Sequence, residues 1–141
     1  MSRYIRPFRC EVLTPAGRVC AHEAISVILP AGDGQYGVLG GRSPLITALG
    51  GGPLTIETSG GERLEYFAAG GFASMRQNVL TVVADECALL SDLDREDAWQ
   101  AIERAREMPV ETDESYERRT EALAVARARF ALVQARGQKR G

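Results

Sequence analysis

The sequence has too few histidines and no suitably spaced cysteines for the common catalytic and metal sites. It contains one histidine, His22, and three cysteines, Cys10, Cys20 and Cys87, without C-x-x-C spacing. Zinc sites need clusters of these residues, and nucleophilic catalysis needs a Ser, Cys or Thr beside a base. The sequence therefore predicts no catalytic residue, no metal site and no cofactor, which argues against a small enzyme.

Strong charge and long apolar runs are also missing. The net charge is −2, whereas a nucleic-acid-binding domain usually carries a basic face. No run approaches the roughly eighteen uncharged apolar residues of a membrane span, and the first residues lack the apolar segment of a secretory signal. The odd number of cysteines predicts reduced, partly buried thiols in a cytosolic protein. A redox pair of Cys10 and Cys20 across a hairpin is the alternative.

A glycine motif is present, but it does not predict dinucleotide binding. Residues 32–37, GDGQYG, have the spacing G-x-G-x-x-G and follow a strand-like run at residues 24–29. The phosphate-binding form of this motif needs a helix directly after the glycines. Here Gly40, Gly41 and Pro44 follow, and a helix interior tolerates these residues poorly. We therefore expect these glycines to form a tight turn between strands.

The chain changes character near residue 91. Of its 15 glycines, 13 lie in residues 1–90, whereas 21 of its 36 charged side chains lie in residues 91–141. Glycine supplies turns and breaks regular elements, while Ala, Glu and Arg favour helix. The sequence therefore predicts one domain in residues 1–90 and a second in residues 91–141.

Residues 1–90 are predicted to form an antiparallel β-sandwich, with a barrel as the related possibility. Short strand-like runs alternate with Gly and Pro turns, and no helical pattern interrupts them. The expected strands are residues 8–13, 19–29, 36–39, 44–49, 53–58, 62–69, 79–84 and 87–90.

Residues 91–141 are predicted to form an antiparallel two-helix hairpin. Asp94 caps the first helix, Pro109 stops it, and the second helix runs from Tyr116 onward. Both apolar stripes are narrow and rich in alanine. At about 25 cal/mol per Å² such a hairpin is worth only a few kcal/mol on its own, so we expect it to be able to leave the sandwich.

Charge is sorted along this hairpin. Residues 92–117 carry ten acidic and three basic side chains, and residues 118–141 carry one acidic and seven basic. An antiparallel arrangement would lay these sets against each other, each exposed contact contributing under about 1 kcal/mol. The pattern fits a solvated helical face, or a basic helix that binds an acidic partner once released. Charge alone leaves both interpretations open.

Three ordered segments resemble a known family. They are GDGQYGVLGGRSPLITAL, FAAGGFASMRQNVLTVVAD and DLDREDAWQAIERA, and they are similar to segments of the epsilon subunit of bacterial F-type ATP synthases, called delta in mitochondria. The resemblance spans about residues 8–134. It implies a two-sheet β-sandwich of about ten strands with a C-terminal helical hairpin. It also implies a non-catalytic rotor subunit of a proton-translocating enzyme.

The resemblance also implies partners for the sandwich. In the family this part docks on the gamma subunit and rests on the c-ring, at the cytoplasmic face of the bacterial plasma membrane. The corresponding contact positions here are Gln35, Tyr36 and Arg42. Relatives often carry an acidic residue beside the second glycine and a histidine at the position of Arg42, so this chain departs from the pattern at two polar contacts.

For the hairpin, the resemblance implies inhibition. The family's hairpin extends along gamma into the catalytic alpha and beta subunits and blocks ATP hydrolysis, with its basic second helix against an acidic beta segment. We expect the same of this chain. The basic residues that would take part are Arg118, Arg119, Arg127, Arg129 and Arg136.

Some family members bind ATP in the folded hairpin through [I/L]-D-x-x-R-A and helix arginines. The corresponding positions here are Leu93, Asp94, Asp97, Ala98, Arg104 and Arg127. Asp97 replaces the motif arginine, and its carboxylate would repel a triphosphate. We therefore expect weak or absent ATP binding.

A free-standing sandwich that binds sugar or peptide, with a helical tail, is the alternative function. It predicts an exposed aromatic platform on the strands. Aromatic residues make up only 6% of the chain, and its one tryptophan, Trp99, lies in the helical part.

Overall fold

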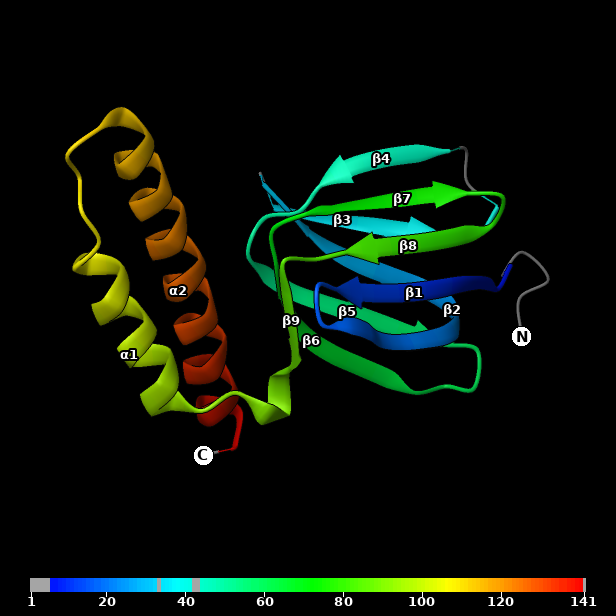
Figure 1. Cartoon of the computed structure of the whole chain (residues 1–141). Helices are drawn as coiled ribbons and strands as arrows, with labels where there is room; N and C mark the ends of the chain where they lie inside the picture. The colour runs from blue at the N-terminus through cyan, green and yellow to red at the C-terminus, as the bar shows by residue number, and fades with distance from the viewer. Residues whose placement is uncertain (1–5, 33, 42–43, 141) are drawn as a thin grey trace.

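The computed structural model describes residues 6–32, 34–41 and 44–140. Within these ranges the chain forms strands up to Leu89 and helices from there on (Figure 1). The strands are β1 (Phe8–Thr14), β2 (Gly17–Ala31), β3 (Gly34–Leu39), β4 (Leu45–Ala48), β5 (Gly52–Thr58), β6 (Arg63–Ala69), β7 (Phe72–Arg76), β8 (Val79–Val83) and β9 (Glu86–Leu89). The short 3-10 helix η1 (Leu90–Asp92) leads into α1 (Arg95–Arg106) and α2 (Asp113–Arg140).

The strands form the two layers of a sandwich, which confirms the predicted fold class. Their hydrogen-bonded order is β4-β7-β8-β1-β2-β5-β6-β9, with β3 also paired to β2. The long strand β2 belongs to both layers, because its first half pairs with β1 and its second half with β3 and β5. Its register to β5 shifts between Ala24 and Ser26, and such an irregularity bends a strand from one sheet to the next. One pair, β1 with β8, is parallel.

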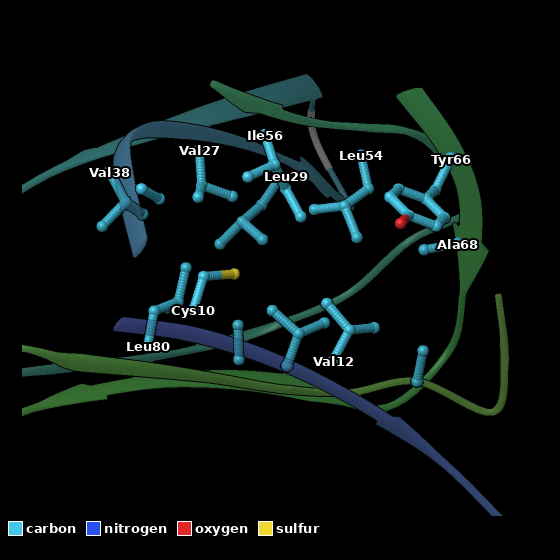
Figure 2. Packing of buried hydrophobic residues seen from close by; sticks show 14 of the residues in the cluster. Cys10, Val12, Val27, Leu29, Val38, Leu54, Ile56, Tyr66, Ala68 and Leu80 are labelled. Atoms are coloured by element: carbon cyan, nitrogen blue, oxygen red, sulfur yellow. The ribbon is translucent and has the colours of Figure 1, made fainter. Parts of the chain in front are cut away.

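The core lies between the two layers. Figure 2 shows Val27, Val38 and Ile56 on one side of it, facing Cys10 and Leu80 on the other. All five side chains are fully buried. Alternate residues of each strand face this core, as the two-residue period of a strand requires.

The three cysteines pack in or against this core and are free in the structure. Burial raises the pKa of the Cys10 thiol to about 12 and that of Cys87 to about 11. Burial also raises the pKa of Cys20. A thiol with a raised pKa holds its proton and is a poor nucleophile. The thiols are therefore part of the apolar core. The structure shows Cys10 and Cys20 as separate free thiols and not as the redox pair given above as the alternative.

The first glycine of the motif, Gly32, lies in a turn between strands, as predicted, whereas Gly34 and Gly37 belong to strand β3 itself. β2 ends at Ala31 and pairs there with Gly34, the first residue of β3. The segment after the glycines is thus a strand, and no helix N-terminus is present to bind a pyrophosphate. Asp33, between the first two glycines, lies outside the described residues.

Two elements differ from the sequence-based expectation. Strand β7 was not among the expected strands, because it has only five residues and directly follows Gly70 and Gly71. Helix α2 begins three residues earlier than Tyr116, at Asp113. A reciprocal cap explains the early start: the backbone N–H of Ser115 donates to Thr112 Oγ1 at 3.0 Å, and the N–H of Thr112 donates to Ser115 Oγ at 2.9 Å.

The hairpin has the thin seam that its sequence predicts. Asp94 caps α1 by accepting the backbone N–H of Asp97 at 3.1 Å. The Trp99 and Phe130 rings meet across the seam with centroids 5.6 Å apart. Among the described residues no ion pair joins α1 to α2, so the opposite charges of the two helices are not paired across the seam. Small and aromatic side chains fill the seam instead. No helix in the described ranges is long and apolar enough to span a membrane.

Candidate functional site

An apolar row crosses the outer side of the sheet that contains β4, β7, β8 and β1. Ala48 pairs with Phe72, Phe72 with Val83, and Val83 with Leu13. Ile46 precedes Ala48 by two residues, so it lies on the same side of β4. Phe72 is 46% exposed and Ile46 76% exposed. We call Leu13, Ile46, Ala48, Phe72 and Val83 the outer face.

The outer face exists because these strands carry apolar residues on both sides. Their intervening residues, such as Ala73, Met75 and Val82, are buried in the core. A half-buried antiparallel strand normally alternates apolar with polar side chains. Apolar side chains on the solvent side of four neighbouring strands therefore mark a surface for a partner.

Charged side chains border this apolar surface. Arg9 Nε bonds Glu11 Oε1 at 2.7 Å, and Arg18 lies 3.9 Å from the same oxygen. The hydrogen bond from Arg9 holds the pKa of the Glu11 carboxyl below its usual value. An apolar centre with a charged border is the usual anatomy of a protein–protein interface.

The outer side of the other sheet has a different character. Glu57, Arg63 and Glu65 form exposed ion pairs there. Phe67 also points outward, yet it is only 1% exposed. The Arg129 guanidinium of α2 covers it, 5.0 Å from the ring centroid. This sheet is therefore charged where it meets solvent and covered by α2 where it is apolar.

The predicted c-ring and gamma contact residues lie beside the glycine turn. Gln35 is exposed in β3, opposite Pro30 of β2, and Tyr36 is half-buried and packs against the core. Arg42 lies outside the described residues. The turn is at the hairpin end of the sandwich, because Ala31 bridges Leu49 and the adjoining Gly51 lies against Val125 of α2.

The five predicted inhibitory arginines have different surroundings. Arg118 and Arg127 are exposed. Arg119 Nε donates to the carbonyl of Arg106 at 3.4 Å, near the end of α1. Arg129 forms an ion pair with Glu86 of β9. Arg136 donates to the carbonyls of Leu90 and Leu93, the latter at 2.7 Å. Two of the five thus hold α2 to the sandwich and its linker.

The degenerate ATP-motif residues do not converge on one site. A hollow of about 570 Å³ lies between the hairpin and the sandwich beside their contact. Arg104, Arg118 and Arg129 are among the residues that line it. Asp94 lines a different hollow, beside Trp99. The other motif positions belong to neither lining: Leu93 is half-buried, Ala98 is buried in the helix seam, and Asp97 and Arg127 are exposed. No group of His, Cys, Asp and Glu within the described ranges could hold a metal ion.

Sequence reasoning missed the outer face. The signal was available in LITA and FASMR, where apolar residues occupy both parities of a short strand. Only the register shows that they form one row, because strand pairs join residues far apart in the chain, such as Leu13 and Val83.

Comparison with known proteins gives a consistent match. The family model described as "ATP synthase, Delta/Epsilon chain, beta-sandwich domain" matches residues 7–89. An ATP synthase epsilon chain from Rhodopirellula baltica is 39% identical over 123 residues, covering 86% of this chain and 94% of that protein. The epsilon chain of a Janthinobacterium species is 35% identical over 135 residues, covering 94% and 96%.

Solved structures match the fold. A chain of the Euglena gracilis mitochondrial ATP synthase, in a cryo-EM structure of its OSCP, F1 and c-ring, has a TM-score of 0.73 at 22% identity. That match covers 89% of this chain and 80% of the other. A chain from the central stalk and c-ring of the Tetrahymena thermophila enzyme has a TM-score of 0.66 at 12% identity, covering 89% and 95%.

Proposed function

This chain belongs to the ATP synthase delta/epsilon family and is thus a non-catalytic subunit of the rotor stalk, and we propose that it couples c-ring rotation to the catalytic core through gamma. The observation that carries the coupling proposal is the outer face, an uncovered apolar surface with a charged border. Residues 1–90 supply the coupling and residues 91–141 the regulation. Family membership removes the alternative of a free-standing sugar- or peptide-binding module.

The gamma subunit is the partner proposed for the outer face. Phe72 and Ile46 are large apolar side chains exposed on a rigid sheet, and such side chains dominate interface energetics when a partner buries them. The glycine turn with Gln35 and Tyr36 is the segment proposed to meet the c-ring, as in the family. Exposed backbone at the glycines allows a close approach of the partner.

The hairpin is proposed to inhibit ATP hydrolysis by entering the catalytic alpha and beta subunits. Its thin, alanine-rich seam and its docking through one side of α2 support this, because little apolar surface has to separate. Arg118 and Arg127 are exposed in the folded position, so they are available for the first contact with an acidic beta segment. In the cell the chain works as a peripheral subunit at the cytoplasmic face of the bacterial plasma membrane.

Truncation after Ser91 tests this function. ATP hydrolysis is measured with the cognate catalytic core, reconstituted with the full chain or with the shortened one. The shortened chain keeps β1 to β9 and the outer face, so we expect it to assemble and to leave hydrolysis faster than the full chain does. Equal hydrolysis after assembly would reduce the hairpin to a structural support. Failure of both forms to bind the core would contradict the coupling role.

ATP binding to the free chain is expected to be weak or absent. The motif residues are spread over separate surroundings, and Asp97 places a negative charge where the motif has an arginine. Calorimetric titration should show only the heat of dilution, and a micromolar dissociation constant would contradict this. An Asp97→Arg variant is the matched comparison: tighter binding in it would assign the loss to the carboxylate.

A further inference from the structure

Arg129 and Arg136 lie on the side of α2 that faces the sandwich. They are seven residues apart, and Val125 and Val133 occupy the same helical stripe because residues three, four and seven apart share a face. Val133 is buried, and Val125 lies against Gly51 of the β4–β5 connection. The two guanidinium groups are therefore part of the docking surface of the hairpin.

Arg129 makes two contacts with the sandwich. It forms an ion pair with Glu86 of the edge strand β9 and lies over the Phe67 ring of β6. The arginine side chain is 23% exposed, so its charge is partly removed from water and Glu86 is the carboxylate that compensates it. Charge-assisted hydrogen bonds of this kind are among the stronger polar contacts in proteins.

Arg136 contacts the segment through which the hairpin joins the sandwich. It donates to the carbonyls of Leu90 and Leu93, at the two ends of η1. The Leu90 carbonyl also accepts the backbone N–H of Leu93 at 3.2 Å, and the Leu93 carbonyl lies just past the end of η1, where carbonyls are often satisfied by a basic side chain. Arg136 therefore holds the C-terminal part of α2 against its own linker.

The Arg129 contact is incomplete. Its Nε is buried without a hydrogen-bond partner among the described residues, and a buried donor without an acceptor is costly. The folded position thus satisfies the charge of Arg129 only in part. A partner that offers more carboxylate oxygens can compete with Glu86 for the same guanidinium.

We propose that Arg129 and Arg136 form a latch that holds the hairpin on the sandwich and keeps these two arginines away from an acidic partner. Undocking of the hairpin and exposure of Arg129 and Arg136 are then one event. The same two side chains bind the sandwich and its linker in the docked position and the acidic partner in the released position. The balance between Glu86 and the carboxylates of the partner sets how often the hairpin leaves. This inference deepens the proposed inhibitory function and rests on it for its consequence in the complex.

Replacement of Glu86 by glutamine tests the latch in the free, full-length chain. The change keeps the shape of the side chain and removes its charge. Hydrogen exchange of the α2 amides is expected to become about fivefold faster, because an undocked hairpin with a thin seam opens locally. Amides of β1 and β2 should exchange as in the unaltered chain. Unchanged exchange in α2 would overturn the proposal.

Asp85→Asn is the matched control. Asp85 lines the same hollow and is next to Glu86 in the chain, but no ion pair of the described residues involves it. We expect α2 exchange in this variant to stay at the unaltered rate. If Asp85→Asn and Glu86→Gln accelerate α2 exchange equally, the effect comes from negative charge near the hairpin in general, and the latch proposal is wrong.

An Arg129→Gln variant and the double variant with Glu86→Gln complete the test. If the two side chains act through one contact, the double variant exchanges as Arg129→Gln alone does. If the double variant instead shows the product of the two single-variant accelerations of α2 exchange, Arg129 and Glu86 do not act through one contact and the pairing is wrong.

Hydrolysis by the reconstituted core separates the latch from the inhibitory function. Glu86→Gln keeps all five arginines, so we expect it to inhibit at a lower chain concentration than the unaltered protein does. Faster α2 exchange, with hydrolysis no slower than with the chain shortened after Ser91, would establish the latch and contradict the inhibitory role.

Discussion

Replacing Phe72 by aspartate is expected to weaken binding of the cognate gamma subunit by about 100-fold, or roughly 3 kcal/mol. Phe72 lies at the centre of the apolar row, between Ala48 and Val83. A partner that covers this row would bury the new carboxylate without an opposite charge, and burial of an unpaired charge is expensive. The measurement is the dissociation constant of the purified pair, by calorimetry or surface-immobilised binding.

The substitution should leave the free chain stable. Phe72 is 46% exposed and points away from the core, so the thermal midpoint should fall by only a few degrees. Val110→Asp is the matched control, because Val110 is 54% exposed in the connection between α1 and α2. It introduces the same charge far from the outer face and should leave gamma binding unchanged. Equal loss in both variants, or none in Phe72→Asp, would remove the outer face as the docking surface.

Gly71→Ala is expected to destabilise the sandwich strongly, by about 3 kcal/mol or more. Gly71 has φ +87°, and an added Cβ would lie 1.9 Å from the carbonyl oxygen of Val83. That oxygen belongs to the backbone of β8, which pairs on both sides. Neither the turn nor the strand can move away without losing its sheet hydrogen bonds. Urea unfolding of the two proteins measures the difference.

Gly61→Ala separates the two causes. Gly61 has a similar φ of +92°, but an added Cβ would meet nothing within 4 Å. We expect this variant to lose only the cost of the left-handed conformation, about 1–2 kcal/mol. If both alanine variants unfold at the same urea concentration, close approach to Val83 contributes nothing and the explanation for Gly71 is wrong.

Local signals were enough to predict the two-part architecture. Gly and Pro turns separate the strands, and Asp94 and Pro109 bound the first helix because capping and helix termination depend on neighbouring residues alone. The alanine-rich stripes predicted a thin seam for the same reason. The two misplaced features, β7 and the start of α2, had weak local signals: a five-residue strand after two glycines, and a cap that uses serine in place of the usual glutamate.

The candidate sites were predicted less completely. Resemblance to the family predicted Gln35 and Tyr36 as partner contacts. Charge and resemblance together predicted the five arginines as inhibitory residues. Neither source distinguishes Arg127, which is exposed, from Arg129, which pairs with Glu86. The two residues differ in the side of α2 that they occupy, and which side meets the sandwich depends on how the hairpin docks.

The sequence by itself determined that this chain is a sandwich of short strands followed by a two-helix hairpin whose second helix is basic, because turns, caps and stripes are local properties. Only the tertiary structure decided which surfaces stay open. Strand order put Leu13 beside Val83, and docking of α2 covered Phe67 while Phe72 remained exposed. Both outcomes depend on pairings between residues distant in the chain, which set the register and the covered face and which no local pattern encodes.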